Sequence, residues 1–254
     1  MKSVNAEPKQ NHLLLRSANP ALSSKTFSDI PNSTERVMTV DGTVNKIAIS
    51  LLILLSTGYL TYSFQITGFV FIGFIGGLVV GILTIMKKAL SPITVPIYAA
   101  LQGLALGGIS FMFNEMYQGI VPQAIALTVG ILFSLLLAYR SRLIKPTENF
   151  KLGVAAATGG ILIVYVIGFV ASMFGSALPI LSINNSSLFS IGFSLFVVVI
   201  ASLNLVLDFD FIEEGAEIGA PKYMEWYATF GLLVTLIWLY IEILRLLSKL
   251  NSRR

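Results

Sequence analysis

Seven apolar runs follow one another along most of the chain, separated by short polar segments. Each run is close to the roughly 20 residues of α-helix that cross a bilayer core about 30 Å thick. Because the apolar stretches are continuous, they favour helices over the alternating strands of a membrane β-barrel. The pattern predicts an all-α integral membrane protein, a bundle of seven transmembrane helices. The runs cover Asn45–Phe64, Gly68–Met86, Ile93–Phe113, Ile120–Tyr139, Gly153–Phe174, Leu188–Asp208 and Trp226–Leu247.

The composition agrees with a membrane location. Of the 254 residues, 55% are hydrophobic and 12% are charged, whereas a soluble domain averages about 25% charged residues. A core of this size is too small to hide that much apolar surface, and the mean hydropathy of +0.82 gives the same indication. Cysteine is absent and His12 is the one histidine. Disulfides, thiolate metal sites and multi-histidine metal centres are therefore excluded.

The first 44 residues differ from the rest of the chain. They are polar, rich in Ser, Asn, Pro and Lys, and show no sustained periodicity. They lack an apolar stretch followed by a small-residue cleavage site, so they are not a cleavable signal peptide. We predict a disordered cytoplasmic tail at residues 1–44, either simply solvated or used for regulatory binding, and a membrane domain at residues 45–250.

Lys and Arg gather on alternate connections. The N-terminal tail and the connections after the second, fourth and sixth runs carry them, whereas the other three connections have none. Because cytoplasmic loops are enriched in Lys and Arg, this asymmetry predicts a cytoplasmic N-terminus. With seven crossings, the C-terminal cations Arg245, Lys249, Arg253 and Arg254 lie outside, which conflicts with this tendency. We nevertheless retain the seventh crossing. The net charge of +4 comes from cations distributed according to membrane topology, so it does not indicate nucleic-acid binding.

Two acidic residues, Asp208 and Glu242, fall within apolar runs. A charged side chain at the centre of a membrane helix costs about 2.5–3.5 kcal/mol on insertion scales, so such residues are functional candidates by default. Asn204 precedes Asp208 by four residues and shares its helix face, as Thr235 and Trp238 share the face of Glu242. These three residues are candidates to line a pathway.

The sixth and seventh runs are joined by a short connection, so they are expected to be antiparallel neighbours. Two carboxylates in one site of low dielectric constant titrate as a coupled pair. When ionised, the pair attracts a cation such as Ca²⁺, which prefers oxygen ligands; when protonated, it does not. Asp208 and Glu242 are thus the candidate gate of a pH-sensitive cation pathway.

Simpler interpretations stand beside this one. Asp208 is near the end of its run. Alternatively, it is solvated by water near the membrane interface or caps the next connection. Glu242 is alternatively paired with Arg245, one turn further on. The acidic stretch that begins at Asp210 is interpreted as a solvated connection, or as a group of acids that concentrates cations at the inner mouth, which makes Asp210 a further pathway candidate. No firm metal site emerges from these residues.

Small residues recur every four positions in the second and third runs. The series are Gly73, Gly77 and Gly81, and then Ala99, Gly103 and Gly107. Small residues at this spacing let another helix backbone approach closely. We interpret them as packing contacts within one bundle, with a dimer face as the alternative.

Three stretches together resemble the Bax inhibitor (TMBIM) family, in its bacterial branch. They are Ser91–Ala99 with the glycines that follow, Gly192–Phe209 with its Leu-Asp-Phe ending, and Tyr240–Arg245. The resemblance implies a seven-helix fold whose last helix is surrounded by the other six. It also implies a pH-sensitive Ca²⁺ leak gated by two aspartates, one on each of the last two helices. The location that it implies is the bacterial cytoplasmic membrane.

The chain departs from the family pattern at two positions. Asp208 matches the first gating aspartate, but the second falls on Thr235, which is not an acid. Glu242 lies two turns further on the same face. Either Glu242 replaces the second aspartate, or the chain lacks the gating pair. Gln102 stands where many bacterial relatives have Glu. It is a further candidate to line the pathway.

Two functions therefore remain open: a passive cation leak, with Ca²⁺ or H⁺ as the candidate ion, and a regulator that binds other membrane proteins such as a protease. An enzyme is not expected, because the sequence has no HExxH motif, no Gly-x-Gly-Asp and no nucleotide-binding loop. No cofactor is expected either. The lipid bilayer is the one partner that the apolar runs require.

Overall fold

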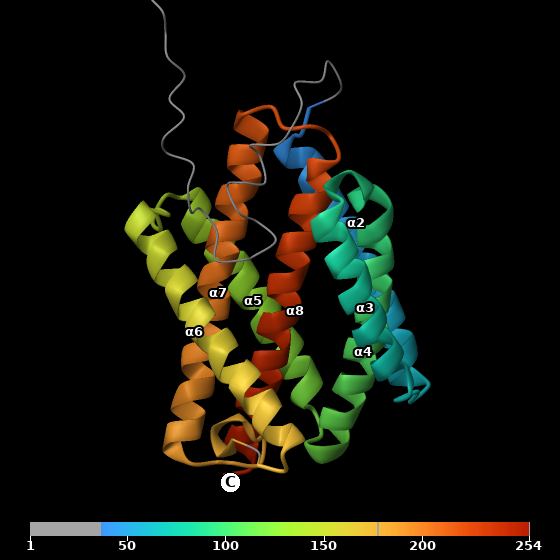
Figure 1. The fold of residues 1–254 in the computed structure, drawn as a ribbon, viewed down its shortest axis with the longest axis vertical. Helices are drawn as coiled ribbons and strands as arrows, with labels where there is room; N and C mark the ends of the chain where they lie inside the picture. The colour runs from blue at the N-terminus through green and yellow to red at the C-terminus, as the bar shows by residue number, and fades with distance from the viewer. Residues whose placement is uncertain (1–36, 177, 254) are drawn as a thin grey trace, which may run out of the picture.

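The computed structural model describes residues 37–176 and 178–253. Within them, seven helices are long and apolar enough to cross a membrane, which confirms the predicted all-α bundle (Figure 1). Two short 3₁₀ helices, η1 (Lys88–Leu90) and η2 (Pro179–Leu181), lie in connections. The seven long helices are α2 (Val40–Ser63), α3 (Phe69–Met86), α4 (Ser91–Met116), α5 (Ile120–Arg140), α6 (Glu148–Met173), α7 (Leu188–Glu217) and α8 (Met224–Asn251).

Polar caps explain where several helices begin. Thr39, Thr147 and Ser187 each accept a hydrogen bond from a backbone N–H in the first turn of α2, α6 and α7, which satisfies a donor that the helix leaves open. Because of the Thr39 cap, α2 starts at Val40, five residues before the predicted run, while most of the predicted tail lies outside the described residues.

The largest difference from the predicted boundaries is at the end of α7. This helix continues to Glu217, nine residues beyond Asp208, so the acidic stretch is helical and only residues 218–223 connect α7 to α8. The added turns hold buried Phe211 and Ile212 as well as acidic residues, and the buried apolar groups give the helix a reason to continue. Asp208 consequently lies within the helix and not at its end.

Helix α8 lies in the middle of the bundle (Figure 1). It packs directly against α2, α4, α5 and α7. The side chain of Tyr165 reaches it from α6, and Gly81 of α3 lies beside the ring of Phe230. The last helix is therefore central, with α2, α4, α5 and α7 packed around it and single contacts from α3 and α6, in agreement with what the family resemblance implies. Its surroundings are accordingly protein for most of its length, because α8 has the largest buried share of the seven spans.

The glycine series mediate contacts inside the bundle. A methyl group built on Gly73 of α3 would overlap the carbonyl oxygen of Leu101 in α4. One built on Gly107 of α4 would overlap the carbonyl oxygen of Gly58 in α2. The absence of a side chain at these positions lets the three helices approach closely, which confirms the interpretation as packing within one bundle.

The segment before α2 is bound to the connection between α7 and α8. The Met38 N–H donates to the Ala220 carbonyl over 2.6 Å, and Val37 forms an isolated antiparallel bridge with Pro221. The Met38 side chain is buried against residues of α7 and α8. We call Val37, Met38 and Thr39 the N-terminal latch. The bundle end that carries it is the N-terminal end, and the opposite one is the C-terminal end.

Candidate functional site

Buried polar side chains follow the contact between α7 and α8, and we call this set the polar seam. Thr235, Glu242 and Lys249 are spaced by seven residues, two helical turns, so they lie on one face of α8. That face meets α7, because Lys249 binds Ser190 and Ser194 there. The seam consists of Ser190, Ser194, Asn204 and Asp208 of α7 and Thr235, Glu242 and Lys249 of α8.

Lys249 occupies the C-terminal end of the seam and is completely buried. Its Nζ donates to the carbonyl of Ile180 at 2.8 Å, the carbonyl of Ser190 at 3.3 Å and the hydroxyl of Ser194 at 2.9 Å. All three donors of the ammonium group thus have an acceptor. We did not identify this residue from the sequence, although its seven-residue spacing from Glu242 was a usable signal.

Glu242 takes part in an ion pair one turn along its own helix. Its Oε1 accepts from Arg245 Nη1 at 3.0 Å and from the Tyr165 hydroxyl of α6 at 2.7 Å. Arg245 Nη1 also donates to Oε2 at 3.2 Å and to the Tyr165 oxygen at 2.9 Å. The carboxylate is 2% exposed, so the triad neutralises a charge that the membrane interior disfavours. These contacts favour the simpler interpretation of Glu242 as a structural partner of Arg245.

Asp208 is fully buried. It lies 18 residues after Ser190, about five helical turns, so it shares the face of α7 that Lys249 of α8 contacts. It lies nine residues before the end of α7, and Glu242 lies 18 residues after the start of α8. At 1.5 Å per residue, the two carboxylates differ in depth by about 14 Å. The structure therefore does not bring Asp208 and Glu242 together, and Thr235 is the closer of the α8 candidates to the depth of Asp208.

The remaining seam candidates make contacts of a structural kind. Asn204 Nδ2 donates to the Thr158 hydroxyl of α6 and to the Ile200 carbonyl, both at 2.9 Å. The buried hydroxyl of Thr235 donates to the Gly231 carbonyl at 3.3 Å. Trp238 is half-buried and packs in an apolar cluster between α6 and α7. In these hydrogen bonds both side chains act as donors, and neither the amide oxygen of Asn204 nor the hydroxyl oxygen of Thr235 acts as an acceptor.

Two predicted pathway candidates lie outside the polar seam. Asp210 forms an ion pair with the buried Lys151 of α6, with Oδ2 and Nζ 2.6 Å apart. Gln102 lies at the contact of α4 with α3, where its side-chain amide faces Gly77. The structure therefore assigns Asp210 to the α6–α7 contact and Gln102 to the α3–α4 contact.

Glu225 closes the N-terminal end of the site and was not identified from the sequence. Its Oε1 accepts from the Thr39 N–H and hydroxyl, both at 3.0 Å, and from Lys222 Nζ at 2.7 Å. Lys46 Nζ lies 3.3 Å from Oε2. This buried carboxylate thus joins the N-terminal latch to the start of α8. Thr39 and Glu225 are 186 residues apart, and no local pattern indicates such a pairing.

Residues 37–176 and 178–253 contain no group of three or more His, Cys, Asp or Glu side chains placed to hold a metal ion. The carboxylates of Asp210, Glu225 and Glu242 each form an ion pair with Lys or Arg. The arrangement supplies buried charges and hydroxyls between two helices.

Six apolar helices around a central seventh helix that carries buried charges define a multi-pass integral membrane protein. The chain belongs to the Bax inhibitor 1-like family, whose family model matches residues 19–252. This family is generally non-enzymatic. No curated protein and no solved structure matches the chain.

Proposed function

We propose that the protein is a pH-sensitive cation leak of the Bax inhibitor-like family, with Asp208 as the gate and Ca²⁺ as the conducted ion. The observation that supports it is the complete burial of Asp208 on the α7 face that Lys249 of α8 contacts. Placing a charged aspartate inside a membrane helix costs about 2.5–3.5 kcal/mol, so a chain retains one there mainly where it has a use. The resemblance to the family adds a matching position at Asp208.

The chemistry of the gate follows from the charge of the carboxyl group. A protonated Asp208 is neutral and gives a cation no attraction, whereas an ionised Asp208 does. Ca²⁺ prefers oxygen ligands, and the oxygens of Asn204 and Thr235 lie on the same seam. Since Glu242 is engaged with Arg245, the proposal uses one acid in place of the pair of aspartates that the family resemblance implies.

In this arrangement the seam is closed at both ends. Lys249 places a buried positive charge at the C-terminal end, which repels an approaching cation. Glu225 and the N-terminal latch seal the other end. Conduction therefore requires α8 to shift relative to α7 or the latch to separate from the connection.

We place the N-terminal end on the cytoplasmic side of a bacterial cytoplasmic membrane. Lys87, Lys88 and the cations of the α5–α6 connection support this orientation through the positive-inside tendency. Two of the four C-terminal cations no longer conflict with it. Arg245 is paired with Glu242, and Lys249 is buried among oxygens, so neither is a free charge in a loop.

Calcium flux into liposomes tests the leak. Purified protein is reconstituted around a Ca²⁺-sensitive dye, and flux is measured between pH 5 and pH 8, the range in which buried carboxyl groups can titrate. We expect the flux to rise with pH as Asp208 ionises. Asp208→Asn is expected to abolish this rise, while Asp41→Asn, the same change at an exposed aspartate of α2, retains it.

The alternative function, a regulator that binds other membrane proteins, predicts a different outcome. A correctly folded protein that passes no Ca²⁺ at any pH contradicts the leak. The same holds for an Asp208→Asn variant whose flux keeps the pH dependence of the original chain. In either case, crosslinking in native membranes followed by identification of the bound proteins becomes the relevant experiment.

A further inference from the structure

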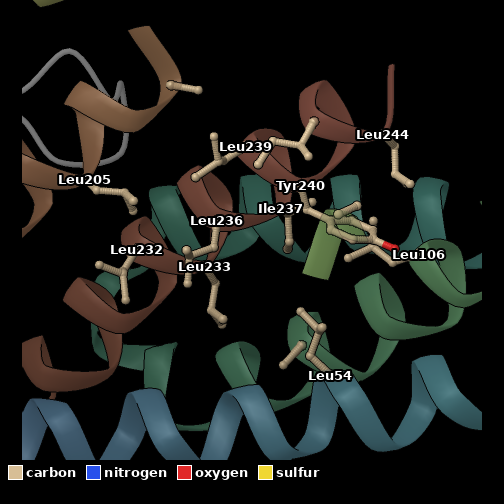
Figure 2. Packing of buried hydrophobic residues seen from close by; sticks show 14 of the residues in the cluster. Leu54, Leu106, Leu205, Leu232, Leu233, Leu236, Ile237, Leu239, Tyr240 and Leu244 are labelled. Carbon is tan, nitrogen blue, oxygen red and sulfur yellow. The ribbon is translucent and has the colours of Figure 1, made fainter. Parts of the chain in front are cut away.

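A cavity of about 530 Å³ lies in the half of the bundle opposite the polar seam. Its floor is formed by buried side chains of three helices. Leu54 of α2, Leu106 of α4 and Leu233, Leu236 and Ile237 of α8 meet there, as Figure 2 shows. A volume of roughly 300–1,000 Å³ is typical of sites that bind small molecules.

The mouth of the cavity opens sideways, between α2 and α5. The lining residues at the mouth include Leu55 and Tyr59 of α2, which are 54% and 71% exposed, and Ile125 and Val129 of α5, which are 42% and 44% exposed. These residues lie within membrane-spanning helices, so the surface that they form faces hydrocarbon. A molecule that enters here comes from the lipid phase and is itself apolar over the part that enters.

The size of the cavity selects among apolar occupants. A transmembrane helix of about 20 residues is 30 Å long and about 10 Å wide, a volume of roughly 2,000 Å³, several times that of the cavity. A partner helix can therefore cover the mouth but cannot occupy the interior. A single flexible hydrocarbon chain has the cross-section and the adaptability to do so.

The wall of the cavity also contains a polar group. Ser110 of α4 and Tyr240 of α8 are both lining residues, and their hydroxyl oxygens are 2.7 Å apart in a hydrogen bond. Two hydroxyls carry two hydrogens and this bond uses one, which leaves one to donate to a carbonyl oxygen. Tyr59 and Tyr62 lie further toward the C-terminal end of α2, and tyrosine is enriched where hydrocarbon meets headgroups.

We propose that this cavity binds one acyl chain of a membrane phospholipid, with the headgroup at the C-terminal end of the bundle beside Tyr59 and Tyr62. The apolar mouth, the volume and the Ser110–Tyr240 pair each fit this occupant. The bound chain would contact α8, the helix that also forms the polar seam. The proposal is independent of the leak, because it requires neither Asp208 nor ion conduction.

Photocrosslinking in defined liposomes tests this site. The full chain is reconstituted in phosphatidylcholine that carries a diazirine in one acyl chain, irradiated, and mapped by peptide mass spectrometry. Leu233 is 0% exposed and Leu236 is 6% exposed, so bulk lipid does not reach them. We expect label on the α8 peptide that contains them. Label confined to exposed faces such as that of α6 would overturn the proposal.

A cavity-filling variant provides the second measurement. Val129→Trp places an indole at the mouth, whereas Val170→Trp makes the same change on the lipid-facing side of α6 at an equally exposed position. We expect Val129→Trp to lower the α8 label about tenfold, a loss equivalent to roughly 1.4 kcal/mol of binding. Val170→Trp is expected to leave it unchanged. Equal labelling of α8 in both variants would show that the chain enters by another route and would overturn the assignment.

Discussion

The buried charges of α8 are each satisfied by different chemistry. Glu225 accepts hydrogen bonds from Thr39 and Lys222, and Glu242 pairs with Arg245. Lys249 has no carboxylate among its hydrogen-bond partners and binds three neutral oxygens. An ion inside a protein is tolerated only when its partners compensate for lost hydration. Each of these groups therefore fixes α8 against a different neighbour.

The Glu242 ion pair allows a test by a double-mutant cycle. Glu242→Gln leaves Arg245, which is 23% exposed, without a charged partner, and we expect it to lower the free energy of unfolding by about 1.5–3 kcal/mol. Adding Arg245→Met removes the unpaired charge and should recover part of the loss. Thermal unfolding in detergent measures Glu242→Gln, Arg245→Met and the double variant, which completes the cycle. Strictly additive losses would show that the two side chains do not interact.

At this scale, the buried acids could be located from the sequence, but most of their partners could not. Asp208 and Glu242 stood out because acids are rare in apolar runs, and Arg245 was identified as a partner by its spacing of one turn. Tyr165 and Ile180 are 77 and 69 residues from the groups that they bind. Contacts of that range depend on how helices pack, which no local spacing encodes.

At the scale of the helices, part of the bundle is held together by close contacts between helix backbones. Helices α2, α3 and α4 pack through glycines at which the backbone of a neighbour takes the place of a side chain. Association of helices in lipid depends on van der Waals contact and not on the hydrophobic effect. A single added methyl group at such a contact consequently separates two backbones.

Two glycine substitutions distinguish close packing from helix propensity. Gly107→Ala forces α4 away from the Gly58 carbonyl, and we expect it to destabilise the protein by about 1–3 kcal/mol through overpacking. Gly130→Ala in α5 meets no atom within 4 Å and should be neutral or stabilise by about 0.5–1 kcal/mol. Unfolding of the two variants side by side makes the comparison. Equal behaviour would contradict the role given to Gly107.

The elements themselves were the most predictable part of the molecule. The length of each apolar run located all seven spans, because a bilayer requires continuous helix of fixed length. The end of α7 was not located, since its last turns carry Glu213, Glu214 and Glu217 beside the buried Phe211 and Ile212. A mixed segment of that kind has the composition of a connection and the packing of a helix.

At the scale of the whole molecule, the N-terminal latch links the first and last parts of the described chain. Backbone contacts of Val37 and Met38 with Pro221 and Ala220 hold it to the α7–α8 connection. Glu225 adds hydrogen bonds to Thr39 and an ion pair with Lys46. The position of α8 within the bundle is thereby coupled to the start of α2.

Removing the charge of Glu225 tests this coupling. Glu225→Gln weakens the contacts with Lys46, Lys222 and Thr39, and charged hydrogen bonds of this kind are worth about 1.5–3 kcal/mol. We expect the Met38 and Thr39 amides to exchange hydrogen at least about tenfold faster, since local opening limits that exchange. Glu115→Gln, at an exposed glutamate of the opposite end, serves as the matched control. Unchanged exchange in Glu225→Gln would mean that the latch is held without its carboxylate.

The central place of α8 has a consequence for synthesis. The ribosome completes this helix after the other six, yet it is the helix around which they are arranged. Until it arrives, its neighbours have no partner for the apolar faces that α8 later covers, and the carbonyls of Ile180 and Ser190 await Lys249. Alone in lipid, α8 would also expose the charges of Glu225, Glu242, Arg245 and Lys249, which the membrane interior disfavours. We therefore expect the charges of α8 to gain their partners only as the bundle closes around it.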